Sequence, residues 1–197
     1  MRTFARVMRW LYHTPRTTNA YVRVLCGFAA VTVSSTMFMI QVLALAGVNV
    51  EDVRAQPILL KDADFHRLDA ETLQVLASIC PEGKPIWSII EESLFRAIPL
   101  TTVVAFMLWS GAKRRWVVCA GMFMGLCTAI IFGIAHGGWV HVPVQGMMGM
   151  CCALAFLKCG GVRGEYWSGL LAAAATHVAA NELLLVIQYV WIIVAIR

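Results

Sequence analysis

The residues best suited to chemistry are two adjacent glutamates and an arginine inside an apolar run. Glu91 and Glu92 lie between Ile86 and Gly111, and Arg96 follows Glu92 by one helical turn. Because Glu92 and Arg96 are four residues apart, a helix places them on one face, where they can neutralise each other. Glu91 is rotated by about 100° on the same helix and lacks that partner. A buried ion pair that only fixes helix packing is the alternative explanation. The sequence therefore offers one carboxylate held by an arginine and one that is available.

Two histidines and an asparagine occur in later apolar runs. Phe132 and His136 are four residues apart, as are His177 and Asn181, so each pair projects from one helix face. The helical rise from the ends of the predicted spans places His136, His177 and Asn181 at the depth of the two glutamates. A lone histidine at the end of a span is usually an interfacial residue. Two histidines, a free carboxylate and an amide at one depth instead favour a functional site.

The composition explains why these charges must face protein or water. The 197 residues are 60% hydrophobic and 14% charged, and their mean hydropathy is +0.74. These values exclude a soluble domain and indicate an integral membrane protein, in which an ionisable group at the bilayer centre costs about 2.5 kcal/mol or more. The net charge of +5 comes from basic residues that flank apolar runs, so no nucleic-acid partner is expected. Six of the seven cysteines lie in or beside apolar runs, which predicts no disulfide framework.

The predicted fold class is all-α: a polytopic helical membrane protein with about five transmembrane helices, the last four of which form a core. The expected spans of this core are residues 86–111, 116–135, 141–157 and 166–196. The chain divides into a basic amphipathic N-terminal segment at 1–24, the first transmembrane helix at 25–48, a polar segment at 49–85 and the four-helix core at 86–197.

The two segments outside the core have their own expected roles. Phe4, Val7, Met8 and Leu11 recur at helical spacing, which predicts a short basic helix on an anionic membrane surface. A transit peptide is the alternative interpretation. In the polar segment, Asp69 can cap a short amphipathic helix. This segment is expected to be a lid over the site, an interfacial helix or a plain connection.

The basic residues predict an orientation. The N-terminal arginines, residues 113–115, and the pair Lys158 and Arg163 fall on the same side of five spans. The positive-inside rule makes this side cytoplasmic. The N-terminus is therefore expected to be cytoplasmic, and the predicted site lies toward the outer side of the membrane.

The three charged or polar patterns together resemble a known family. Residues 91–96 fit the motif EExxxR, residues 132–136 fit FxxxH and residues 177–181 fit HxxxN, in the same order and on separate predicted spans. These are the motifs of the CAAX-protease and bacteriocin-processing family, also called CPBP or Abi. The resemblance covers roughly residues 86–197 and leaves the first span and the polar segment outside.

The resemblance implies an intramembrane endopeptidase similar to the Ras-converting CAAX prenyl endopeptidases. Such an enzyme hydrolyses a peptide bond of a membrane-associated protein or peptide. By the family's motifs, Glu91 and His136 would activate the attacking water, and His177 and Asn181 would be oxyanion donors. The supporting residues would be Glu92, Arg96 and Phe132.

Several alternatives remain open at this stage. Metal-free glutamate chemistry with no cofactor is preferred, but Glu91, His136 and His177 also match a catalytic zinc site by ligand type. The first alternative to an enzyme is a non-catalytic immunity or binding protein of the same fold. The second alternative is a small proton-coupled carrier. The predicted outward site argues against prenylated cytosolic substrates. Glu182 is a further acid that the motifs do not explain.

Overall fold

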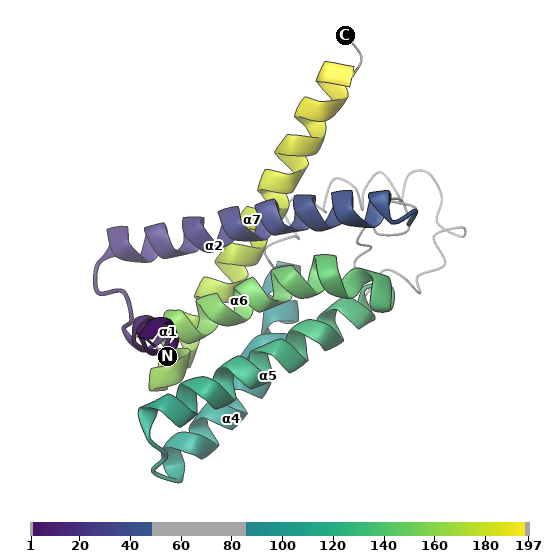
Figure 1. Ribbon diagram of the computed structural model, residues 1–197. Coiled ribbons are helices and arrows are strands. Elements are labelled where there is room, and N and C mark those ends of the chain that lie inside the picture. The colour runs from purple at the N-terminus through teal and green to yellow at the C-terminus, as the bar shows by residue number, and fades with distance from the viewer. Residues whose placement is uncertain (1, 49–85, 196–197) are drawn as a thin grey trace.

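The computed structural model describes residues 2–48 and 86–195, and all regular structure in these two ranges is helical (Figure 1). The predicted all-α class is therefore confirmed. The polar segment at 49–85, with the short helix expected after Asp69, lies outside the described residues. The elements in order are α1 (Arg2–Tyr12), α2 (Thr18–Leu45), a helical stretch at 86–92, η4 (Ser93–Ala97), α4 (Ile98–Trp109), α5 (Arg114–Ala135), η5 (Trp139–His141), η6 (Val142–Gly146), α6 (Met147–Lys158), η7 (Gly161–Arg163) and α7 (Tyr166–Ala195).

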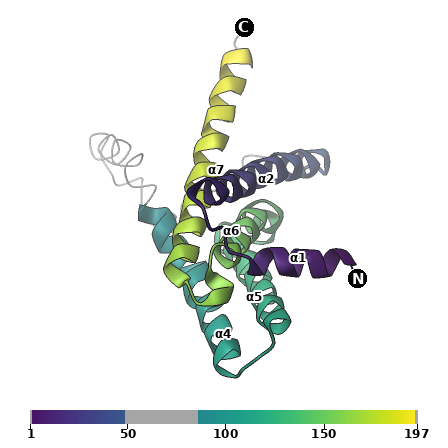
Figure 2. The ribbon, with the colours of Figure 1, turned by 90° about the vertical axis from the view of Figure 1, so that its left-hand side faces the viewer.

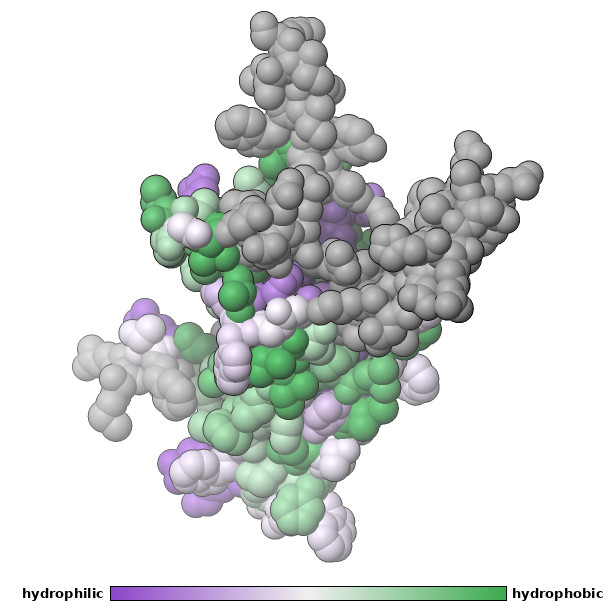
Figure 3. Space-filling view, turned by 90° about the vertical axis from the view of Figure 1, so that its right-hand side faces the viewer, coloured by the Kyte–Doolittle hydropathy of each residue, from purple (hydrophilic) through white to green (hydrophobic). Residues whose placement is uncertain are grey.

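Three helical stretches of the described chain are long and apolar enough to cross a membrane: Thr18–Leu45, Arg114–Ala135 and Trp139–Arg163. The two other expected spans are helical as well, because residues 86–92 continue through η4 into α4 and α7 has 30 residues. Hydrophobic side chains cover much of the described surface on the face shown in Figure 3. The exposed fractions of Leu45, Trp109 and Trp167 are 90%, 84% and 80%. This is the surface of an integral membrane protein, with tryptophans near helix ends as at a membrane interface.

Helix α6 is the central element of the bundle. It packs against α2, α5 and α7, and most of its residues are buried. Small residues on α5 permit this packing: a Cβ added at Gly121 would lie 2.8 Å from a methyl group of Leu157, and one added at Gly125 would lie 3.1 Å from Ala153 Cβ. These two glycines therefore permit a close contact between α5 and α6.

Helix α2 covers one side of α6 and α7. Its buried residues Ala29, Thr32, Val33 and Thr36 recur at helical spacing, and the hydroxyl of Thr32 donates to the Phe28 carbonyl at 2.8 Å. Near its start, the Tyr21 hydroxyl donates to the Ser168 carbonyl on α7 at 2.7 Å. A helix therefore occupies most of the expected first span, but it begins before residue 25 and ends at Leu45.

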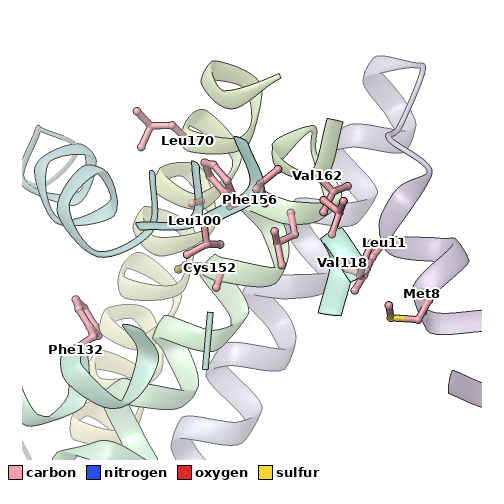
Figure 4. Packing of buried hydrophobic residues seen from close by; sticks show 14 of the residues in the cluster. Met8, Leu11, Leu100, Val118, Phe132, Cys152, Phe156, Val162 and Leu170 are labelled. Carbon is pink, nitrogen blue, oxygen red and sulfur yellow. The ribbon is translucent and has the colours of Figure 1, made fainter. Parts of the chain in front are cut away.

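Helix α1 differs from the prediction in what its apolar face contacts. Met8 and Leu11 are buried in the protein core beside Val118 and Val162, instead of facing only a membrane surface (Figure 4). The Lys158 ammonium, at the end of α6, donates to the carbonyls of Trp10 and His13 at the C-terminal end of α1. Apolar residues recur at the same spacing in a helix that lies on lipid and in a helix that packs on protein. The spacing alone therefore could not show which of the two surfaces α1 contacts. Figure 2 shows α1 extending sideways from the bundle.

Two π-helical turns interrupt the regular helices, and each is associated with a proline. In η4, the Ile98 amide donates to the Ser93 carbonyl, five residues earlier, and Pro99 is the second residue of α4. Proline has no amide hydrogen and cannot donate to the carbonyl four residues before it, which loosens the turn there. The second π turn, η6, contains Pro143. π turns recur at functional sites, and η4 carries the EExxxR arginine.

Candidate active site

The Glu92 carboxylate connects the residues of the first and third motifs. Its side chain is fully buried; Oε1 lies 2.9 Å from His177 Nδ1 on α7, and Oε2 lies 3.3 Å from Arg96 Nε. Because a carboxylate accepts and does not donate, His177 Nδ1 carries the hydrogen of this bond. The predicted pairing of Glu92 with Arg96 is therefore confirmed, and Glu92 also orients the His177 ring.

Arg96 is fully buried and has three kinds of partner. Besides Glu92, its Nε donates to the Gly149 carbonyl on α6 at 3.3 Å, and its Cζ lies 4.1 Å from the centroid of the Phe132 ring. The guanidinium thus joins the first motif to α6 and to the second motif on α5. Within the described residues its two terminal nitrogens donate no hydrogen bond, so the aromatic face is an important part of their environment.

Glu91 differs from Glu92 in exposure and in partner. Its side chain is 15% exposed, and Oε2 lies 3.8 Å from His177 Nε2. The His177 ring is therefore placed between the two glutamates, with one nitrogen toward each. The sequence predicted that Glu91 is the carboxylate not held by Arg96, and this geometry agrees.

Phe132 and His136 are in contact, as the four-residue spacing predicts. Their ring centroids are 4.2 Å apart with an interplanar angle of 56°, and the Phe132 ring also meets His177 edge-on at 6.1 Å. His136 Nδ1 lies 2.8 Å from the Phe132 carbonyl oxygen. Since a carbonyl can only accept, Nδ1 carries the hydrogen, and in a neutral ring the lone pair is on Nε2. Phe132 thus orients two histidines and contacts the arginine.

Asn181 lies one turn beyond His177 on α7 and is half-buried. Within the described part of the chain it has no hydrogen-bond partner. The helix places it on the side of α7 that carries His177. Its predicted place beside the site is consistent with this register.

Sequence reasoning missed two residues of α6 that contact this group. The Gly149 carbonyl accepts from Arg96, and a Cβ at Gly149 would collide with Arg96 Nη2 and lie 3.3 Å from Phe132 Cδ1. Cys152 lies with Glu92 and His177 in a group whose polar atoms are all within 4.8 Å of one another. Neither residue is in a motif. The only sequence signal was a glycine among bulky apolar residues, which indicates a close contact.

The zinc alternative can be compared with these positions. In a tetrahedral zinc site the ligand atoms lie about 3–3.5 Å apart. Among the described residues, only Glu92, Cys152 and His177 form a group within 4.8 Å, and this group lacks Glu91 and His136. Its Glu92 is already paired with the Arg96 cation, which would repel a metal ion. This group differs from the zinc ligands Glu91, His136 and His177 that the sequence left open, and metal-free glutamate chemistry stays a prediction.

Comparison with known proteins identifies the family. A model of the type II CAAX prenyl endopeptidases, described as Rce1-like, matches residues 85–183, which is half of the chain. The chain belongs to this family. No curated protein and no solved structure matches it. The match contains all three motifs, so the resemblance inferred from them is confirmed.

Family membership indicates the general activity of this chain. It supports intramembrane endopeptidase activity of the CAAX type, with a protein or peptide as the substrate. The apolar helices agree with an enzyme that is an integral membrane protein. The buried cluster of Glu92, Arg96, Phe132, His136 and His177, with Glu91 at its edge, is the candidate active site.

Proposed function

We propose that this protein is a glutamate-type intramembrane endopeptidase that hydrolyses a peptide bond of a membrane-associated substrate without a metal. The observation that carries the proposal is the position of His177 between two carboxylates. Glu92 is held by Arg96 and His177, whereas Glu91 is the partly exposed one. Two adjacent acids with such different surroundings suit two different roles.

Glu91 and His136 are proposed to activate the attacking water. Glu91 takes the proton as general base, and the Nε2 lone pair of His136 accepts a hydrogen bond that orients the water. The water oxygen attacks the scissile carbonyl and forms a tetrahedral intermediate. Protonated Glu91 then returns the proton to the leaving amine as the C–N bond breaks, so protons balance over the cycle.

His177 and Asn181 are proposed to stabilise the oxyanion of that intermediate. Nδ1 of His177 already donates to Glu92, so Nε2 can donate only when the ring is an imidazolium. The Glu92 carboxylate compensates that positive charge, since Glu91 is protonated in the intermediate. Asn181 supplies an amide donor from the next turn, and preorganised donors of this kind contribute about 2.7–4 kcal/mol each to transition-state stabilisation.

Glu92, Arg96 and Phe132 are proposed as positioning residues. Glu92 fixes the orientation of His177, Arg96 contacts Glu92 and the α6 backbone, and the Phe132 ring packs at a tilt against His136. Supporting contacts of this sort matter because a displacement of about 1 Å in a catalytic group can cost 100-fold in rate.

The proposed substrate is a membrane-associated protein or peptide that reaches the site from the outer side, with the N-terminus of the enzyme in the cytoplasm. The distribution of basic residues supports this orientation. A prenylated cytosolic protein would approach from the opposite side. We therefore expect cleavage of peptides that carry no prenyl group.

The test is cleavage of a quenched-fluorescent peptide library, with a farnesylated CAAX peptide beside it, by detergent-purified protein. Wild type is compared with Glu91→Gln, His136→Ala and the matched control Glu165→Gln, which removes an exposed glutamate. We expect activity in wild type and control and a loss of at least 100-fold in the other two. Glu91→Gln with wild-type activity would refute the proposed base. A wild type that cleaves no peptide would favour the non-catalytic binding protein.

A further inference from the structure

A cavity of about 310 Å³ lies between α1 and the start of α5. Four basic side chains line it: Arg9 and His13 from the N-terminal segment, and Arg114 and Arg115 from the first turn of α5. All four are exposed. Tyr12 forms part of the wall, and the Arg114 guanidinium carbon lies 4.4 Å from its ring centroid, which holds this cation in place.

No carboxylate neutralises the three lining arginines within the described chain. Residues 1–48 and 93–164 contain neither Asp nor Glu, and none of the three lining arginines forms an ion pair with a described residue. The first turn of α5 adds to the positive potential, because it has no acidic residue and no side-chain cap on its amide hydrogens. Three guanidinium groups that form no ion pair with residues 2–48 or 86–195 lie around one cavity, and they suit a phosphate, which accepts paired hydrogen bonds from arginine.

The cavity is separate from the candidate active site. Its apolar lining residues Met8 and Val118 lie at one end of the buried hydrophobic cluster, and Phe132 of the active site lies at the other end (Figure 4). No step of the proposed hydrolysis uses any of its residues. A ligand there would contact the enzyme without contacting the catalytic groups.

We propose that this cavity binds the phosphate headgroup of an anionic membrane lipid. The exposed Trp10 and Trp116 beside it suit the membrane–water interface, where headgroups lie. The volume of about 310 Å³ is larger than a free phosphate ion requires and leaves room for the glycerol portion of a headgroup. Basic pockets at the ends of transmembrane helices are a known way to hold such headgroups.

The position of α1 gives this binding a structural consequence. Helix α1 supplies one wall and α5 the other, so a bound headgroup would bridge them. Lys158 already fixes the C-terminal carbonyls of α1. The lipid would therefore reinforce the docking of α1 on the bundle.

The test measures binding of dihexanoylphosphatidylglycerol to the full-length protein in a neutral maltoside detergent by thermophoresis. Dihexanoylphosphatidylcholine and inorganic phosphate are titrated in parallel. The variants are Arg9→Gln and Arg115→Gln, and the matched control is Arg6→Gln, an exposed arginine of α1 outside the lining. All are exposed positions, and thermal midpoints without lipid check that each variant is folded.

We expect phosphatidylglycerol to bind saturably and at least tenfold more tightly than phosphatidylcholine or phosphate. Loss of one charge-assisted contact should weaken this binding about tenfold in each lining variant and not in Arg6→Gln. Equal binding of inorganic phosphate would overturn the lipid assignment in favour of a soluble anion. Equal weakening by Arg6→Gln, or equal binding of phosphatidylcholine, would overturn the specific site.

Discussion

Replacing Arg96 with methionine tests whether the buried ion pair supports the fold of the site. Arg96 and Glu92 are both fully buried, so bulk water does not screen their attraction. Arg96→Met retains much of the side-chain volume but leaves the Glu92 carboxylate without the guanidinium, with His177 as a hydrogen-bond partner. Removing one member of a buried pair costs about 3–5 kcal/mol, because an uncompensated charge stays in a low-dielectric environment.

Removing both charges should cost much less than removing one. In the double variant Glu92→Gln/Arg96→Met neither member of the pair carries a charge, and the glutamine oxygen can still accept from His177 Nδ1. Neutral replacements of whole buried pairs are often harmless to stability. We therefore expect the double variant to recover at least half of the stability that Arg96→Met loses.

The assay is thermal unfolding in detergent, followed by tryptophan fluorescence. A loss of 3–5 kcal/mol corresponds to a midpoint lower by roughly 6–20 °C for a chain of this size. The matched control is Arg163→Met, which breaks the ion pair with Glu165 in which the two side chains are 41% and 48% exposed. An exposed pair contributes about 1 kcal/mol or less, so its midpoint should fall by no more than roughly 4 °C.

Two results would refute this reasoning. If Arg96→Met lowers the midpoint no more than Arg163→Met, burial does not strengthen the pair. If the double variant is no more stable than Arg96→Met, the loss comes from the contacts of Arg96 with Gly149 and Phe132 and not from an isolated Glu92 charge.

Three further variants test other contacts. Gly149→Ala should lower peptidase activity at least tenfold, because its Cβ would displace the Arg96 guanidinium; wild-type rates would contradict this. Leu11→Ala should lower the free energy of unfolding by about 2–3 kcal/mol, since Leu11 is fully buried, whereas Val7→Ala, at 42% exposed, should change it by less than about 0.5 kcal/mol. Lys158→Met should accelerate amide hydrogen exchange in α1, and unchanged exchange would show that its two hydrogen bonds do not anchor the helix.

The contacts that the sequence predicted are those within one helix. The Glu92–Arg96 pair and the Phe132–His136 contact both follow from four-residue spacing, which fixes neighbours on a helix face. The family motifs then joined these pairs to His177. Local spacing was therefore sufficient to predict these two contacts, whereas the catalytic roles of the motif residues stay predictions.

The contacts between helices could not be predicted in the same way. That His177 faces both glutamates, and that Gly149 accepts from Arg96, depends on how α6 and α7 pack against η4. Helix α1 shows the same limit, because its apolar face suited a lipid surface as well as the protein surface that Leu11 contacts. The number of spans and their orientation remain predictions from composition and charge.

The central claim is that Glu91 and His136 activate water without a metal. The most direct measurement is the rate of peptide cleavage by purified wild type before and after prolonged treatment with a strong zinc chelator, with Glu91→Gln as the inactive reference. We predict that the chelator leaves the wild-type rate unchanged, while Glu91→Gln stays at least 100-fold slower. A wild-type rate that falls to the reference level and returns when zinc is added back would contradict the account.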